Sequence, residues 1–255
     1  MTFPLFDLSG RAVVVTGGNG GIGLGMARAL LQAGARVAIW GTNPGKTARA
    51  RDELAAHGEV IAQVCDVGDE AAVDAAFAES IERLGHVDAC FANAGVSSFS
   101  APIGSMTHDE FRRVMRVNLD GVFFTFRAAS RHMIDRGAGG SLVVTASTAA
   151  VEGAARNSHY GASKGAVTSY ARALAVELAR HRIRVNSLLP GWIESDMTSG
   201  VFGDSKFAGA VLPRIPLRRW GTADDFGGIA VFLASDASSY MTGADLLIDG
   251  GYTKF

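Results

Sequence analysis

Tyr160 and Lys164 are two residues whose types and spacing could perform proton chemistry. On a helix, residues four apart lie on one face, about one turn from each other. An ammonium held beside a phenol favours the phenolate and lowers the tyrosine pKa from about 10. A tyrosine with a lowered pKa can exchange protons near neutral pH. The pair therefore predicts a general acid–base site, and the alternative is a tyrosine and a lysine that share an exposed helix face.

A glycine-rich turn, Thr16 to Gly23, follows an apolar segment near the N-terminus. Glycines permit a tight turn and let the backbone approach a pyrophosphate, which then meets the positive end of the next helix. Two patterns overlap here, because Gly18, Gly20 and Gly23 fit G-x-G-x-x-G while Gly17, Gly21 and Gly23 fit G-x-x-x-G-x-G. The position of the turn between a strand-like and a helix-like segment favours nucleotide binding over a purely structural loop.

Strand-like and helix-like segments alternate along the chain, and no linker divides it. Apolar runs predict strands at 11–16, 36–40, 60–64, 87–92, 141–145, 183–189 and 246–248. The stretches between them predict helices, the later ones at about 69–84, 107–136, 158–181 and 222–234. Continuous apolar strands separated by helices indicate a parallel sheet that is covered on both faces. We expect an α/β fold: one doubly wound Rossmann-type domain over 1–255, with a mostly parallel seven-stranded sheet.

Composition limits the classes of partner. The formal net charge is -1 and 48% of residues are apolar, so the whole surface has no general attraction for nucleic acid or an anionic membrane. We see no signal peptide, and no apolar run reaches the roughly 18 residues of a membrane helix. Cys65 and Cys90 lie in strand-like runs and are expected to be free buried thiols. The scattered histidines predict no catalytic metal. A cytoplasmic protein that acts on a small molecule is the expectation.

In order and spacing, these motifs resemble the short-chain dehydrogenase/reductase family over essentially the whole chain. Thr16 to Gly23 is similar to the T-G-x-x-x-G-x-G motif of that family, and Ala92 to Gly95 is similar to its N-A-G signature. Ser147 precedes Tyr160 by thirteen residues, which is the family's spacing. Further similar segments are Cys65-Asp66-Val67, Val117-Asn118-Leu119, Pro190-Gly191 and Leu246 to Gly251.

The resemblance implies hydride transfer between NAD(P)(H) and a ketone or secondary alcohol. It implies that Tyr160 exchanges the oxygen-bound proton and that Ser147 hydrogen-bonds the same oxygen. Lys164 would lower the tyrosine pKa and hold the nicotinamide ribose, and Asn118 would hold a water that links Lys164 to solvent. The implied cofactor-binding residues are Gly17, Asn19, Gly21, Ile22, Gly23, Thr42, Asn43, Asp66, Val67, Asn93, Gly95, Tyr160, Lys164, Pro190, Gly191, Ile193 and Ser195. It also implies a homotetramer formed through helices 107–136 and 158–181 and the chain end.

The choice between NAD and NADP depends on the segment after the second strand, Trp40 to Lys46. No carboxylate is present there to accept from a 2′-hydroxyl or to repel a 2′-phosphate. The arginine of NADP-preferring relatives is also missing, because Thr42 stands in its place. Thr42, Asn43 and Lys46 could donate to a phosphate, or Lys46 could simply face water. The sequence leans slightly towards NADP.

Two other function classes compete with an oxidoreductase. Gly161 to Gly165 fits the G-x-S-x-G elbow of hydrolases, but no apolar strand precedes it. Ser163 and His181 would also lie about 27 Å apart on one helix, so no triad can form. A cofactor-binding regulator without turnover is the second alternative. Such a protein would not need Asn118, Ser147, Tyr160 and Lys164 together.

The substrate is the least defined part of the prediction. The loop 192–216 is expected to form a lid with several apolar side chains, so a largely apolar pocket is plausible. By resemblance, Ser97, Val151 and Trp192 lie near the reacting carbonyl. Arg156 either binds a substrate carboxylate or faces solvent. These features are compatible with a ketone, a cyclic alcohol, a sterol, a sugar or a hydroxy ester.

Overall fold

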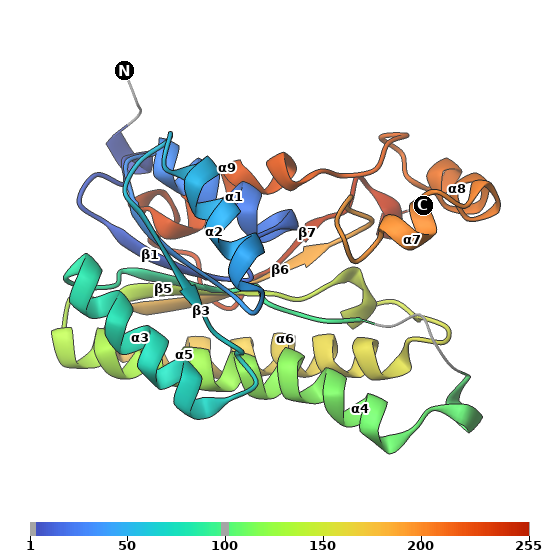
Figure 1. Cartoon of the computed structure of the whole chain (residues 1–255), viewed down its shortest axis with the longest axis horizontal. Coiled ribbons are helices and arrows are strands. Elements are labelled where there is room, and N and C mark those ends of the chain that lie inside the picture. The colour runs from blue at the N-terminus through green and yellow to red at the C-terminus, as the bar shows by residue number, and fades with distance from the viewer. Residues whose placement is uncertain (1–3, 98–101, 255) are drawn as a thin grey trace.

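The computed structural model describes residues 4–97 and 102–254, and within them the chain forms one seven-stranded sheet in the order β3-β2-β1-β4-β5-β6-β7 (Figure 1). The strands are β1 Ala12–Thr16, β2 Arg36–Gly41, β3 Val60–Val64, β4 Ala89–Ala92, β5 Gly140–Thr145, β6 Ile183–Pro190 and β7 Asp245–Ile248. Every neighbouring pair is parallel. The prediction of a mainly parallel seven-stranded sheet is confirmed.

The central strands are apolar because both of their faces are covered. All five residues of β1 are buried, and Val14 pairs with Ala38 of β2 on one side and Cys90 of β4 on the other. Successive side chains of a strand point to opposite faces of the sheet. Val14 accordingly belongs to one apolar core, while Val13 and Val15 belong to the other.

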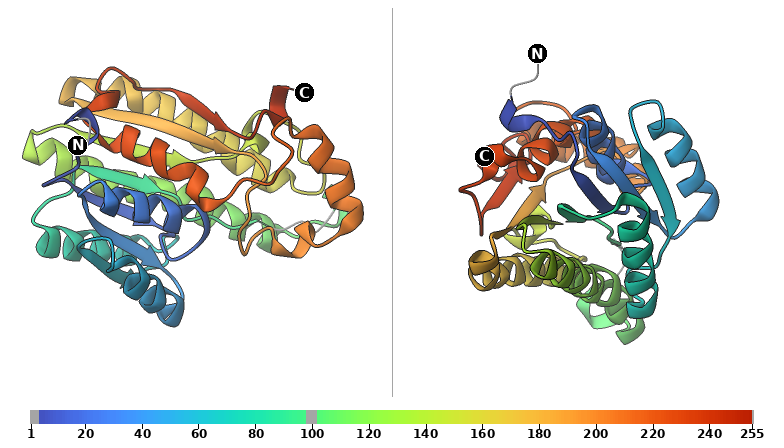
Figure 2. Two further views of the ribbon diagram at one scale, coloured as in Figure 1. Left: turned by 90° about the horizontal axis from the view of Figure 1, so that it is seen from above. Right: turned by 90° about the vertical axis from the view of Figure 1, so that its left-hand side faces the viewer.

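Each core is closed by its own set of helices, as Figures 1 and 2 show. One face is covered by α1 (Gly21–Gln32), α2 (Pro44–Leu54) and α9 (Gly227–Ala234). The other is covered by α3 (Glu70–Leu84), α5 (Gly121–Arg136) and α6 (Ser158–Leu178). Cys65 and Cys90 are buried free thiols, and burial raises the pKa of Cys65 to about 12.

The long helix expected over 107–136 is interrupted. It consists of α4 (His108–Met115), a π-helical turn at Arg116–Asp120, and α5. A π turn carries one extra residue per turn, and such turns occur frequently at functional sites. Asn118 lies in the middle of this one. The helix expected at 222–234 likewise begins with a 3₁₀ turn, Ala223–Phe226, before α9.

The segment 192–216, called the lid segment below, is partly helical. It contains α7 (Ser199–Phe202), α8 (Ser205–Val211) and a 3₁₀ turn at Leu212–Arg214. It lies beside the end of the chain in both views (Figures 1 and 2), where the Trp192 and Tyr252 rings are 6.2 Å apart. In residues 4–97 and 102–254, no helix is long and apolar enough to cross a membrane, and no acidic, cysteine and histidine side chains cluster as a metal site.

Candidate active site

A cavity of about 580 Å³ lies at the carboxyl ends of the strands, the position where open parallel sheets bind ligands. Its volume is within the usual range for a small-molecule or cofactor site. The sequence-predicted residues that line it are Gly17, Asn19, Gly21, Ile22, Asn93, Gly95, Ser147, Tyr160, Lys164, Pro190, Gly191, Ile193 and Ser195. Residues from four strand ends and two helices thus meet in one cavity.

The glycine turn forms one end of this cavity. Gly17 has φ +65° and Gly21 has φ +50°, conformations that side chains rarely adopt. A Cβ at Gly23 would lie 2.4 Å from the Gly17 carbonyl oxygen, so this position requires glycine for packing although it does not line the cavity. The N-terminus of α1 has no side-chain cap, which leaves its first N–H groups available to an anion. The turn therefore fits a pyrophosphate.

Thr16, at the start of the glycine turn, hydrogen-bonds to the segment that follows β4. The backbone N–H groups of Asn93 and Ala94 both donate to Thr16 Oγ1, at 3.0 Å each. Asn93 Nδ2 also donates to the Thr16 carbonyl at 3.1 Å. These bonds hold the loop after β4 against the loop after β1. Thr16 was predicted only as the first residue of the glycine motif; in the structure its hydroxyl positions Asn93.

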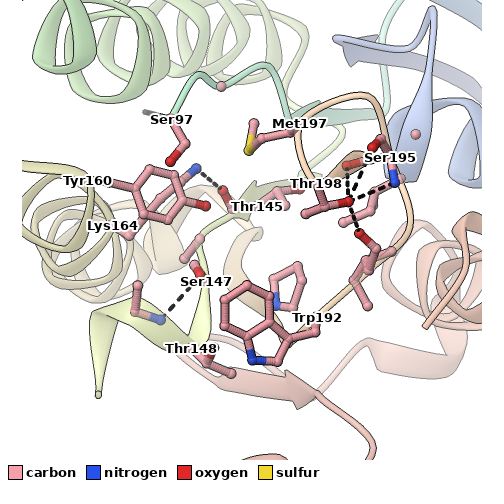
Figure 3. Close-up of a pocket in the computed structure, with 18 of the residues that line it drawn as sticks. Ser97, Thr145, Ser147, Thr148, Tyr160, Lys164, Trp192, Ser195, Met197 and Thr198 are labelled. Carbon is pink, nitrogen blue, oxygen red and sulfur yellow. Dashed lines mark hydrogen bonds between the residues drawn. The ribbon is translucent and has the colours of Figure 1, made fainter. Parts of the chain in front are cut away.

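Ser147, Tyr160 and Lys164 lie together in the middle of the cavity (Figure 3). Ser147 follows β5, and its Oγ accepts from the Ala149 N–H at 3.1 Å. Lys164, which is 3% exposed, donates through Nζ to the Thr145 carbonyl at 2.7 Å. The same ammonium lies 5.6 Å from the centroid of the Tyr160 ring. The i, i+4 spacing therefore places the two side chains on one helix face, as the sequence predicts.

The expected lowering of the Tyr160 pKa is not found. The phenol lines the cavity, and desolvation raises its pKa above the ordinary value, although a hydrogen bond with the Ser147 side chain partly counters the rise. Burial also lowers the pKa of Lys164 to about 8. Desolvation disfavours the charged form of each group, and this effect exceeds the attraction expected from their spacing. Tyr160 is therefore protonated at neutral pH.

Asn118 lies behind the cavity and is completely buried. Its Oδ1 accepts from the Val96 N–H at 2.8 Å, and its Nδ2 donates to the Val96 carbonyl at 2.9 Å and to Ser163 Oγ at 3.0 Å. Asn118 therefore ties the loop after β4 to α6. Gly95 separates it from Lys164, because a Cβ at Gly95 would be 3.3 Å from both Asn118 Oδ1 and Lys164 Nζ. Its role in holding a water stays a prediction.

Four other predicted cofactor residues do not line the cavity. Thr42 is exposed, and Asn43 caps α2 by accepting from the Lys46 N–H. Asp66 accepts from the Gly68 N–H at 2.9 Å and pairs with Arg116 at 3.0 Å. Val67 is buried in the core. The structure does not bring these residues to the cavity wall.

Lys46 does line the cavity, and it does not simply face water. Its Nζ pairs with Asp196 Oδ2 of the lid segment at 2.6 Å. A Cβ at Gly20 would lie 2.5 Å from Lys46 Nζ, so the ammonium rests on the glycine turn. Asp196 was missed in the sequence because 150 residues separate it from Lys46.

The cavity wall near Ser147, across from the glycine turn, contains only some of the residues predicted to lie near the reacting carbonyl. Ser97 and Trp192 line the cavity as expected, and Ser97 Oγ accepts from Asn157 Nδ2 at 2.9 Å. Val151 is 61% exposed, and Arg156 is also exposed; neither contributes to the wall. The wall also includes side chains that sequence reasoning did not assign to it: Thr148, Glu152, Asn157 and Tyr252.

Comparisons with known proteins agree with this geometry. A family model described as enoyl-(acyl carrier protein) reductase matches residues 17–253. The 3-oxoacyl-[acyl-carrier-protein] reductase FabG of Chlamydia pneumoniae is 38% identical, over 96% of this chain and 98% of its own. The solved short-chain type dehydrogenase/reductase from Mycobacterium marinum is 39% identical, covers 98% of each chain and has a TM-score of 0.93. A gluconate 5-dehydrogenase from Burkholderia cenocepacia, in complex with NADP and tartrate, is 36% identical with 98% coverage of each chain and a TM-score of 0.93.

Proposed function

Because the chain belongs to the short-chain dehydrogenase/reductase family, we propose that it is an NAD(P)-dependent oxidoreductase acting on a ketone or secondary alcohol. The observation that carries the proposal is the meeting of the glycine turn with Ser147, Tyr160 and Lys164 in one cavity. The glycine turn fits a dinucleotide pyrophosphate, and the three side chains suit proton transfer at a substrate oxygen. A nicotinamide cofactor, when bound, supplies or accepts the hydride.

The side chains divide the remaining work. The backbone N–H of Ala149 donates to Ser147 Oγ, so the serine O–H remains a donor: it serves the Tyr160 phenol in the resting protein and would serve a substrate oxygen during the reaction. Tyr160 would give its phenolic proton to that oxygen as it becomes an alcohol. Lys164 would hold the cofactor ribose and keep a positive charge beside the tyrosine. Because desolvation keeps Tyr160 protonated at neutral pH, the resting state is suited to reduction of a carbonyl.

Lys46 supports the lean towards NADP. Its ammonium lies on the glycine turn, beside the end of β2, where the adenosine ribose of a dinucleotide belongs. A 2′-phosphate could take Lys46 as its counter-ion in exchange for Asp196. Solved relatives with NADP bound are consistent with this assignment.

We propose that residues 1–255 act as one domain, that the lid segment covers the substrate, and that the protein is cytoplasmic. A homotetramer through the α4–α5 and α6 helices is supported by Phe123, which is 40% exposed, and by Val176, which is 81% exposed. A regulator without turnover is the alternative function.

The direct test is turnover by a panel of ketones and secondary alcohols, followed at the nicotinamide absorbance with each cofactor. Tyr160→Phe should abolish turnover on every active compound and leave NADPH binding intact. Tyr170→Phe is the matched control, because Tyr170 lies on the same helix outside the cavity and should retain activity. Cofactor binding without turnover on any compound would favour the regulator, and full turnover by Tyr160→Phe would overturn the assigned acid.

A further inference from the structure

The order of strands divides the cavity into two halves. The glycine turn follows β1 and Lys46 follows β2, so these residues define a cofactor half. Ser147 and Glu152 follow β5, Trp192 follows β6, and Tyr252 follows β7 at the other side of the sheet. We call this second half the substrate half, because its side chains line the same cavity as Tyr160 and can contact a molecule bound there.

Glu152 is the charged side chain that follows Ser147 in the cavity wall. It is half-buried, and its backbone N–H donates to the Thr148 carbonyl at 2.9 Å, which fixes the turn that carries it. Within residues 4–97 and 102–254, its carboxylate has no hydrogen bond or ion pair. A carboxylate at a cavity wall without a counter-ion repels a second anion, and the repulsion is stronger there than in bulk water.

The cationic side chains near the cavity either have other partners or do not line its wall. Lys46 pairs with Asp196 at 2.6 Å in the cofactor half. Lys164 is buried and donates to the Thr145 carbonyl. Arg214 lies 4.4 Å from the Tyr252 ring centroid and donates to the Tyr252 hydroxyl at 2.7 Å, but it does not line the cavity. Arg156 does not line it either, so this half offers no cation, among the described residues, to receive a substrate carboxylate.

Residues 98–101, which lie outside the described part, read Ser-Phe-Ser-Ala and contain no charged side chain.

Large apolar and aromatic side chains share the substrate half with the uncharged polar residues Ser97, Thr148 and Asn157. Trp192 lies 5.1 Å from the Phe207 ring and 6.2 Å from the Tyr252 ring, in both cases edge to face. All three rings line the cavity together with Met197, and Figure 3 shows Trp192 and Met197 on the side of the cavity across from Tyr160. Aromatic rings of this kind bind apolar or aromatic bodies through their faces and edges.

We propose that the substrate is an uncharged carbonyl compound, or its alcohol, with an apolar or aromatic body, and that Glu152 discriminates against substrates that carry a carboxylate. The inference rests on the proposed oxidoreductase function and specifies its substrate class. Glu152 acts on selection rather than on proton transfer. Its loss should therefore change the ratio of two substrates more than the turnover of a neutral one.

The test compares 4-acetylbenzoate with its methyl ester, because the two ketones differ mainly in a charge remote from the reacting carbon. The wild-type protein should prefer the ester. Glu152→Gln should lower the ester-to-acid ratio of kcat/KM about tenfold, which is the effect expected for two unit charges roughly 12 Å apart at an effective dielectric constant of about 20. Because the ratio is compared between variants, the intrinsic reactivity of the two ketones cancels.

Glu194→Gln is the matched control: it makes the same change of charge at an exposed residue that does not line the cavity, although its neighbours Ile193 and Ser195 do. It should leave the ratio unchanged. If neither ketone is reduced, the same pair is compared as inhibitors of an active panel compound, with the ratio of inhibition constants as the readout. An acid bound as well as the ester, or a ratio unaltered in Glu152→Gln, would overturn the inference. Failure of the proposed function would appear separately, as turnover that does not depend on Tyr160.

Discussion

The buried ammonium of Lys164 should make the protein less stable at neutral pH than a variant without it. Lys164 is 3% exposed, and burial lowers its pKa from 10.5 to about 8. Each unit of difference between the folded and unfolded pKa corresponds to about 1.4 kcal/mol, so charging Lys164 in the folded state costs about 3 kcal/mol. Lys164→Met removes this cost and keeps a side chain of similar length.

The hydrogen bond to the Thr145 carbonyl offsets part of the gain. Losing a hydrogen bond from a charged donor costs about 2 kcal/mol, so Lys164→Met should be about 1 kcal/mol more stable than the wild type at pH 7. The difference in stability between the variant and the wild type depends on pH. Below pH 8 both the folded and the unfolded wild type carry the proton, and the cost is present in full. Between pH 8 and 10.5 the unfolded chain binds more protons, so wild-type stability rises with pH and the advantage of the variant disappears.

Denaturant unfolding of the cofactor-free protein at pH 7, 8.5 and 10, at one protein concentration, measures this difference. Lys206→Met, at an exposed lysine, is the control and should change stability by less than about 0.5 kcal/mol. A Lys164→Met variant that is less stable at pH 7, or a difference that does not shrink with pH, would refute the reasoning. The predicted result means that Lys164 is kept for its chemistry, at a cost in stability.

Two further predictions concern the groups around the catalytic residues. Lys46→Met should weaken NADPH binding about tenfold, while NADH binding changes little. Asp196→Asn should strengthen NADPH binding, because the 2.6 Å pair between Lys46 and Asp196 competes with a 2′-phosphate. Dissociation constants from NADPH and NADH fluorescence measure both effects, and equal losses for the two cofactors in Lys46→Met would contradict the assignment. Asn118→Ala should lower the free energy of unfolding by about 2–3 kcal/mol, because it leaves the Val96 N–H and carbonyl without their amide partner and removes a donor to Ser163 Oγ. A loss below about 1 kcal/mol in denaturant unfolding would show that other groups or water replace the amide.

Local pattern was sufficient for the sheet and for the center of the site. The run Ala12–Thr16 is apolar throughout because the strand is covered on both faces, and this made its position and its parallel neighbours predictable. The Tyr160 and Lys164 spacing predicted a shared helix face for the same kind of reason: regular geometry connects sequence distance to spatial distance.

What could not be predicted depends on tertiary contacts. The π turn at Arg116–Asp120 lies where Arg116 packs on Gly68 and Gly121 packs on Val67, and a helical sequence pattern carries no signal of either contact. The Tyr160 pKa was predicted in the wrong direction because desolvation is set by the cavity around the phenol and not by the neighbouring lysine alone.

The same limit applies to the cavity walls. Asp196 meets Lys46 across 150 residues of chain, and Thr16 meets Asn93 across 77. Glu152 stands in a loop with no periodicity, so only the fold shows that it lines the cavity and has no counter-ion among the described residues. Such pairings follow from the order of strands in the sheet.

The most direct test of the central claim is to follow the hydride itself. The wild-type protein is supplied with NADPH deuterated at nicotinamide C4, separately on each face, together with a ketone that the panel shows to be reduced. We predict that deuterium from one face appears at the carbinol carbon, and that Tyr160→Phe forms no labelled alcohol while it still binds NADPH. An alcohol formed without deuterium from either face, or labelled alcohol formed by Tyr160→Phe at the wild-type rate, would contradict the account.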